Sequence, residues 1–156
     1  MPEELVDVKP FPDKASRKSF TGGALEAERI ALRYVTQGRG GALLAQVRFG
    51  SGSEGAPKRA HGGAVLTVLD EAMGAACWVK GLPVLTARIS AAFRRGVPLE
   101  VDLTVETAIV RETPRIIFVT GRLVDGRGGL YAEAEGSFAR LRPDQVRATF
   151  GDPPSF

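Results

Sequence analysis

The sequence has one cysteine and one histidine among its 156 residues, and it has no asparagine. A lone Cys77 excludes an internal disulfide and any zinc site built from cysteines. His61 has no second histidine with which to share a metal ion. We therefore expect no metal and no bound cofactor, and a chain with a single free thiol is typical of the reducing cytoplasm.

A membrane-spanning run is also missing. Residues 62–79 are apolar enough to raise the question, but Asp70 and Glu71 stand at the centre of this segment. A charged residue at the middle of a bilayer costs several kcal/mol, so we expect no membrane partner. Residues 1–20 mix prolines with charges of both signs and contain no apolar run, which argues against a signal peptide there.

Charge of one sign is not concentrated anywhere in the chain. The formal net charge is +3, and basic residues are spread along the chain, with short pairs such as Lys58-Arg59 and Arg94-Arg95. A protein that binds duplex nucleic acid usually carries a denser basic cluster or a known motif, so we expect no nucleic-acid partner. A few arginines are still enough to meet a small anionic ligand.

Alternation and turn residues predict two strands, one long helix and then four more strands. Residues 25–49 read as two strands joined by a glycine-rich turn at 37–41, and residues 62–80 read as the helix. Four further strands are predicted at 84–93, 99–110, 115–125 and 130–141. The fold class is therefore α+β, with one helix against about six mostly antiparallel strands. The chain divides into a flexible arm at 1–20, one domain at 21–142 and a C-terminal tail at 143–156.

The long helix is apolar on nearly every side, yet it carries Asp70 and Glu71 in its middle. A helix of this kind is buried, with a sheet wrapped around it. A buried carboxylate is costly unless it is paired or has a function. At the start of the helix, Gly62 and Gly63 leave the first N–H groups open to a ligand oxygen, an arrangement that polarises a carbonyl. The plainer alternative is that two glycines serve a tight turn.

Spacing predicts how these groups cooperate. Asp70 lies eight residues after Gly62, which is about 12 Å along a helix at ~1.5 Å per residue. An attacked carbonyl carbon must lie within about 3–3.5 Å of its attacker, so one helix cannot present both groups to one carbonyl. Two antiparallel helices across a twofold axis can. Cooperation between Gly62 and Asp70 therefore predicts a homodimer with its sites at the interface.

The segment HGGAVLTVLDEAMG, residues 61–74, resembles the His-Gly-Gly…Asp/Glu motif of hot-dog-fold acyl-CoA thioesterases, in particular the phenylacetic-acid-degradation type. Residues 81–110 and 121–141 are similar to the rest of that pattern. The resemblance covers about residues 25–142 and implies a hot-dog fold, with dimers that often pair into tetramers. It implies an enzyme that hydrolyses acyl-CoA to a free acid and coenzyme A, which enters as part of the substrate.

The resemblance also implies roles for single residues. Asp70 corresponds to the nucleophile or general base, and the backbone N–H of Gly62 of the partner subunit corresponds to the group that polarises the carbonyl. Thr86 falls on a hydroxyl residue that helps to orient the attacking water in some members. Two departures stand out: Thr86 replaces the more usual serine, and Gly55 stands about where many members carry Asn or Gln.

Further residues are expected to bind substrate or to shape the pocket. His61 shapes the start of the helix, and Met73 and Trp78 belong to the core and to the acyl-pocket wall. The arginine pair after the third strand is expected either to meet coenzyme A phosphates or to lie in a solvated turn. Glu71 points about 100° away from Asp70 around the helix, which favours a supporting role. The predicted binding residues are His61, Gly63, Glu71, Met73, Arg94 and Arg95.

Other functions fit the sequence less well than a thioesterase does. Cys77 and His61 lie sixteen residues apart at opposite ends of the helix, so we interpret Cys77 as a buried apolar residue and not as a nucleophile. Hot-dog dehydratases use a histidine in a different context from the one before these glycines. A non-catalytic acyl-CoA binding or sensing protein on the same fold is the main alternative. A binder gains little from a buried acid, and this favours the enzyme.

Overall fold

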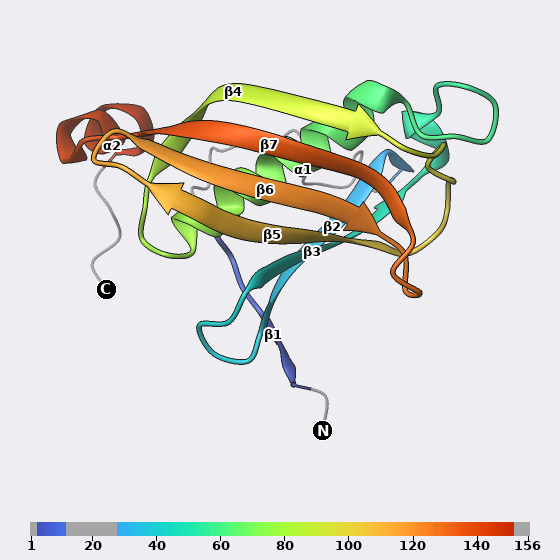
Figure 1. The fold of residues 1–156 in the computed structure, drawn as a ribbon, viewed down its shortest axis with the longest axis horizontal. Helices are drawn as coiled ribbons and strands as arrows, with labels where there is room; N and C mark the ends of the chain where they lie inside the picture. The colour runs from blue at the N-terminus through green and yellow to red at the C-terminus, as the bar shows by residue number, and fades with distance from the viewer. Residues whose placement is uncertain (1–2, 12–27, 152–156) are drawn as a thin grey trace.

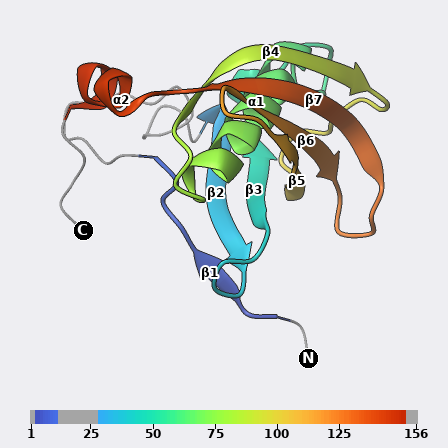
Figure 2. The ribbon, with the colours of Figure 1, turned by 60° about the vertical axis from the view of Figure 1, so that its left-hand side comes forward.

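The computed structural model describes residues 3–11 and 28–151, and in it an antiparallel sheet curls around one long helix (Figures 1 and 2). The elements are β1 Leu5–Asp7, β2 Ile30–Gln37, β3 Leu43–Phe49, a 3₁₀ turn Ser51–Ser53, α1 Gly62–Trp78, β4 Val84–Phe93, β5 Leu103–Glu112, β6 Ile116–Val124, β7 Leu130–Arg140 and α2 Pro143–Phe150. No helix within the described ranges is both long and apolar enough to cross a membrane.

The strands form one seven-stranded sheet in the order β1-β2-β3-β5-β6-β7-β4, and each neighbouring pair is antiparallel. The α+β class and the wrapped helix are therefore confirmed, with one strand more than the six expected. The additional strand is β1, which lies inside the arm expected at 1–20 and pairs with β2. Three residues are too few for an alternation pattern to reveal a strand. The rest of that arm, from residue 12, lies outside the described residues.

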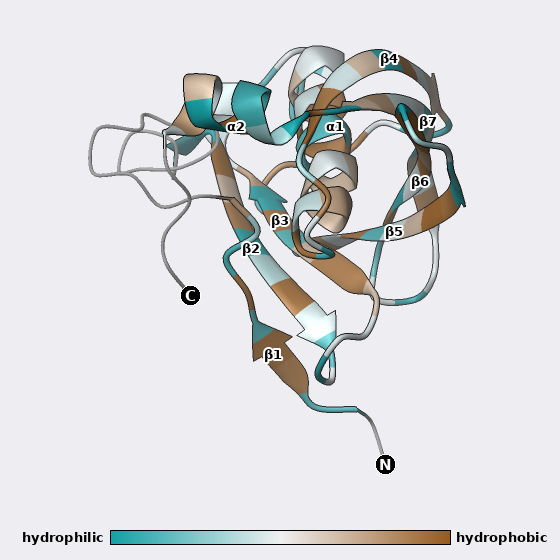
Figure 3. Ribbon diagram, turned by 90° about the vertical axis from the view of Figure 1, so that its left-hand side faces the viewer, coloured by the Kyte–Doolittle hydropathy of each residue, from teal (hydrophilic) through white to brown (hydrophobic). Residues whose placement is uncertain are grey.

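The core lies between α1 and the concave side of the sheet (Figure 3). Met73 is fully buried in this layer. Glycines stand opposite it: a Cβ atom added at Gly121 of β6 would lie 3.2 Å from Met73 Cγ, and one added at Gly136 of β7 would lie 3.4 Å from Met73 Cε. The absence of a side chain at these two positions lets the helix approach the sheet closely.

The segment expected as a C-terminal tail begins with a helix, α2. Pro143 occupies its first turn, and the backbone N–H of Arg142 donates to Gln145 Oε1 at 2.9 Å. Its last residue, Phe150, packs edge-on against Trp78 with ring centroids 5.0 Å apart. The tail is thus anchored to the C-terminal end of α1, while residues 152–156 lie outside the described part of the chain.

Candidate active site

Asp70 and Thr86 are brought together by the reversal of the chain after α1. Gly81 adopts a φ of 73° in the turn, a conformation that favours glycine. Strand β4 then runs back beside the helix. Thr86 stands opposite the buried Phe138 of β7, so its side chain faces the helix. Thr86 Oγ1 donates a hydrogen bond to Asp70 Oδ1 at 2.8 Å.

This hydrogen bond fixes the orientation of a carboxylate that solvent still reaches. Asp70 is half-buried and Thr86 is exposed when the chain is considered alone. A carboxylate oriented by a hydroxyl donor, with part of its surface open, is suited to accept a proton from water or to attack a carbonyl.

The two glycines at the N-terminus of α1 differ in the hydrogen bonding of their backbone N–H groups. His61 caps the helix, because its Nδ1 accepts a hydrogen bond from the Gly63 N–H at 2.8 Å. The N–H groups of Ala64 and Val65 both donate to the His61 carbonyl oxygen. Within the described residues, the Gly62 N–H has no acceptor, and Gly62 is exposed. Gly62 therefore offers the open donor, whereas the Gly63 N–H is committed to His61.

Phe93, at the end of β4, lies beside this open donor. A Cβ atom added at Gly62 would lie 3.9 Å from Phe93 Cε1 and Cζ. The ring is 52% exposed, which is unusual for a phenylalanine of a packed sheet. Sequence reasoning missed Phe93, because its approach to Gly62 depends on the path of β4 and not on a local motif.

The glycine at position 55, where many members of the family carry Asn or Gln, has a steric explanation. A Cβ atom added there would lie 2.8 Å from His61 Cα, closer than real side chains approach a backbone atom. The loop is held in this position by the His61 N–H, which donates to the Ser53 carbonyl at 2.7 Å. Asn or Gln at this position is incompatible with the loop as it is folded here.

One face of α1 is not covered by its own sheet, in contrast to the helix expected to be buried on all sides. The half-buried residues on this face recur with helical spacing: Leu66, Thr67, Asp70 and Glu71. Gly62 and Asp70 both have exposed surface, yet they are separated by about two helical turns, or ~12 Å. The spacing argument for a second subunit therefore applies to this geometry.

The arginine pair after β4 is bound to neighbouring strands. Arg94 Nη2 lies 2.6 Å from Glu133 Oε1. The Arg95 guanidinium lies 4.3 Å from the centre of the Tyr131 ring and 3.9 Å from Asp125 Oδ2. Hydrogen bonds from backbone N–H groups of the β6–β7 turn, with this arginine nearby, hold the pKa of the Asp125 carboxyl below its usual range. The charges of both arginines are thus partly compensated within the chain.

The buried end of α1 contains no nucleophile. Burial, together with the smaller effect of the Glu112 charge, raises the pKa of the Cys77 thiol to about 12. A thiol of this kind is inert. Trp78 donates from Nε1 to the Val84 carbonyl oxygen at 3.3 Å and packs against aromatic rings of both chain ends. Met73 and Trp78 therefore pack within the single chain, and a place in the substrate pocket remains a prediction.

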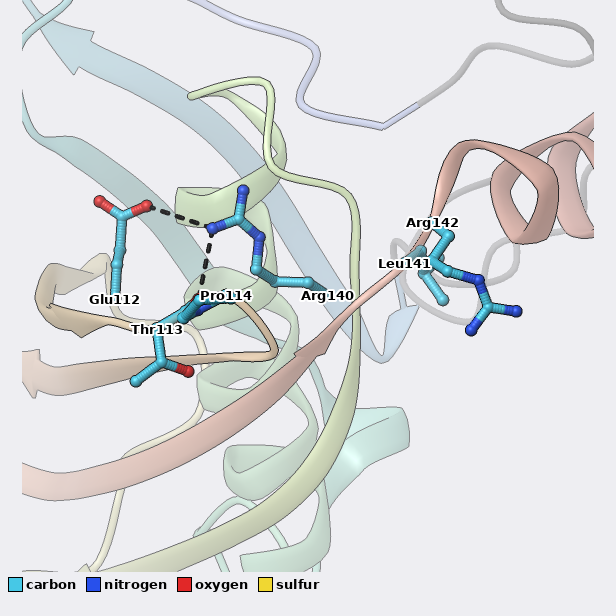
Figure 4. Close-up of a pocket in the computed structure, with 6 residues that line it drawn as sticks. All are labelled: Glu112, Thr113, Pro114, Arg140, Leu141 and Arg142. Carbon is cyan, nitrogen blue, oxygen red and sulfur yellow. Dashed lines mark hydrogen bonds and ion pairs between the residues drawn. The ribbon is translucent and has the colours of Figure 1, made fainter.

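A surface hollow near this end of the molecule is shown in Figure 4. Its lining residues are Glu112, Thr113, Pro114, Arg140, Leu141 and Arg142. Arg140 Nη1 lies 4.0 Å from Glu112 Oε1 and donates to the Thr113 carbonyl oxygen at 3.3 Å. The hollow lies by the β5–β6 turn and does not include Asp70, Thr86 or Gly62. No cluster of three potential metal ligands occurs within residues 3–11 and 28–151.

Part of the chain is similar to known thioesterases. Residues 58–132 match the family model described as the thioesterase superfamily. Acyl-coenzyme A thioesterase THEM4 of Bos taurus is 34% identical over 94 residues, which cover 59% of this chain and 38% of that protein. The chain thus spans well under half the length of this curated relative.

Solved structures share the fold. A hypothetical thioesterase from Streptococcus pneumoniae, solved with coenzyme A, is 18% identical with a TM-score of 0.65, over 73% of this chain and 90% of that one. The E. coli PaaI protein from the phenylacetic acid degradation operon is 16% identical with a TM-score of 0.62, over 75% and 83%. Two further structures of the Streptococcus protein carry alanine in place of an aspartate and of a threonine that lie sixteen residues apart.

Proposed function

We propose that this chain, of which residues 58–132 match the thioesterase superfamily model, hydrolyses an acyl-CoA thioester to a carboxylic acid and coenzyme A. The observation that carries the proposal is the hydrogen bond from Thr86 to Asp70, which orients a half-exposed carboxylate beside the edge strand. The aspartate and threonine replaced in the Streptococcus protein have the same separation as Thr86 and Asp70, which supports a shared role.

Asp70 acts on the thioester carbonyl in one of two ways. As a general base it accepts a proton from water while the water oxygen forms a bond to the carbonyl carbon. As a nucleophile its own oxygen forms that bond, and water then hydrolyses the resulting anhydride. In both cases the C–S bond breaks and the coenzyme A sulfur takes up a proton. Thr86 holds the carboxylate in position throughout.

The carbonyl oxygen is polarised by Gly62 of the partner subunit. Negative charge develops on this oxygen as the tetrahedral intermediate forms, and an open N–H at a helix N-terminus stabilises it. The proposal therefore requires a homodimer in which two α1 helices lie antiparallel. In the site, Asp70 and Thr86 come from one protomer, and the carbonyl-polarising donor comes from its partner.

Two features of the described chain support this dimer. The uncovered face of α1 is one. The other is β4, which pairs only with β7 and leaves its outer edge open. This strand exposes Leu85 by 49% and Phe93 by 52%. An open edge strand with exposed apolar side chains is a template for pairing with another chain. The family resemblance adds the pairing of dimers into a homotetramer.

A thiol-release assay over aryl, short-chain and long-chain acyl-CoA substrates tests the proposal. We expect turnover of at least one class, and the PaaI neighbour from the phenylacetic acid degradation operon directs attention to aryl-acyl substrates first. Calorimetry with coenzyme A accompanies the assay. Binding without turnover of any member of the panel would favour the alternative, a non-catalytic acyl-CoA binding or sensing protein.

A further inference from the structure

Two basic segments that are far apart in the sequence meet near the N-terminus of α1. Lys58 and Arg59 belong to the loop before the helix, and Arg94 and Arg95 follow β4. An isolated antiparallel bridge joins Arg59 to Pro98. Figure 1 shows this loop at the end of the molecule toward which the β4 arrow points, whereas α2 lies at the opposite end.

The three arginines of these segments differ in their partners. Arg94 is paired with Glu133, and Arg95 lies against Asp125 and Tyr131. Arg59, by contrast, forms no ion pair with any carboxylate in residues 3–11 or 28–151, and it is exposed. Its Nη1 donates to the Lys58 carbonyl oxygen at 3.0 Å. The charge of Arg59 is therefore available to a ligand.

Gly96 creates the space in which the Arg59 side chain lies. A Cβ atom added at Gly96 would lie 2.9 Å from Arg59 Cδ and 3.0 Å from Arg59 Nε. The alkyl chain of Arg59 thus crosses the backbone of the β4–β5 connection. Held in this way, a guanidinium presents several donors in one plane, the geometry that matches a phosphate.

The position of Arg59 also fits the site proposed above. Phe93 lies beside Gly62, and Gly96 lies beside Arg59. Three residues of chain span at most about 11 Å, so the Arg59 side chain and the open Gly62 donor belong to one continuous surface. In acyl-CoA, the thioester and the phosphates are the two ends of the pantetheine arm. The pantetheine arm is flexible, so a substrate whose carbonyl meets Gly62 is able to bring its phosphates to Arg59 of the same protomer.

We propose that Arg59, cradled by Gly96, binds the phosphate groups of the acyl-CoA substrate. This inference rests on the proposed thioesterase function and adds a residue that sequence reasoning did not assign. It also shifts the main phosphate contact from Arg94 and Arg95, whose charges are already compensated, to Arg59.

The test compares acyl-CoA with an acyl-pantetheine of the same acyl group, which lacks the nucleotide phosphates. For Arg59→Gln we expect the KM for acyl-CoA to rise about tenfold or more, because charge-assisted hydrogen bonds are lost. The kcat and the hydrolysis of acyl-pantetheine should stay unchanged. Gly96→Ala keeps the charge but displaces the side chain, so it should raise the same KM by a smaller factor. Arg115→Gln, near α2, is the matched control and should have no effect.

Each outcome distinguishes between the two proposals. If the wild type hydrolyses both substrates and Arg59→Gln leaves the KM for acyl-CoA unchanged, the assignment of Arg59 is overturned while the thioesterase function stands. An equal rise of KM for both substrates also overturns it, because the effect would then be structural. If the wild type hydrolyses neither substrate, the thioesterase proposal fails. Calorimetry of coenzyme A with the wild type and Arg59→Gln then tests the phosphate contact independently, and equal affinities would refute it.

Discussion

Thr86 Oγ1 lies 2.8 Å from Asp70 Oδ1, so the edge strand β4 and the middle of α1 are connected by a side-chain hydrogen bond at the candidate site. A threonine hydroxyl that only satisfied the backbone would leave the carboxylate free to rotate. The observed bond selects one orientation of Asp70, and the consequences of this pairing are measurable.

Removing the hydroxyl while keeping the shape tests the role of Thr86. For Thr86→Val we expect kcat to fall by about tenfold or more with little change in KM, since the lost interaction orients the reacting group. Steady-state kinetics with acyl-CoA measure both constants. Thr86→Ser restores the hydroxyl and should retain most activity. An unchanged kcat in a folded Thr86→Val variant would show that the role of Thr86 is structural only.

Asp70→Asn should preserve folding and coenzyme A binding but lower turnover by about 10²–10⁴-fold, because an amide neither attacks nor accepts a proton. Glu71→Gln is the matched control on the next residue of the helix and should retain far more activity. Thiol release and circular dichroism of the two variants give the comparison. Full activity in Asp70→Asn together with loss of activity in Glu71→Gln would assign the reactive carboxylate to Glu71.

The shared site predicts complementation between inactive subunits. Gly62→Pro removes the open N–H, and proline is tolerated in the first turn of a helix, so the variant should fold. Mixed with Asp70→Asn, it forms heterodimers with one intact site and one site lacking both groups. We expect partial recovery of activity after subunit exchange. Zero activity in a mixture shown by mass spectrometry to contain heterodimers would contradict a site built from two chains.

Cys77 should resist alkylation in the folded protein. Because burial raises its pKa to about 12, very little of the thiol is ionised at pH 8, and the thiolate is the reactive form. We expect iodoacetamide to label the native protein very slowly and the urea-unfolded protein readily, as measured by mass spectrometry. Cys77→Ser should remain catalytically active. Rapid labelling of the native chain with loss of activity would contradict the interpretation of Cys77 as an inert buried thiol.

The architecture could be predicted from sequence because its strongest signals are local. The apolar segment after HGG identified the helix, and alternation together with glycine turns identified the six longer strands. The helix ends at Trp78 and not at residue 80, a difference within the usual uncertainty of helix ends. β1 is too short to show a period. α2 has only eight residues, with Val146 and Phe150 on its half-buried face, and this pattern is too short to predict a helix from the sequence.

The candidate site was only partly accessible to sequence reasoning. The sixteen-residue separation between Asp70 and Thr86 allowed the chain to return beside the helix, and the two side chains do meet. The commitment of the Gly63 N–H to His61 depends on the orientation of one imidazole ring, which no spacing specifies. The approach of Phe93 to Gly62 depends on contacts between segments that are distant in the sequence.

Trp78 is the only tryptophan of the chain, and its indole contacts Phe11 from the N-terminal segment and Phe150 from α2. Its near-ultraviolet fluorescence therefore reports on the attachment of both chain ends, at the end of α1 away from Gly62. Emission spectra recorded during gradual denaturation would follow the release of these ends, while turnover would follow the opposite end of the same helix. One intrinsic fluorophore thus makes it possible to ask, without any label, whether the chain ends detach before the catalytic end loses its structure.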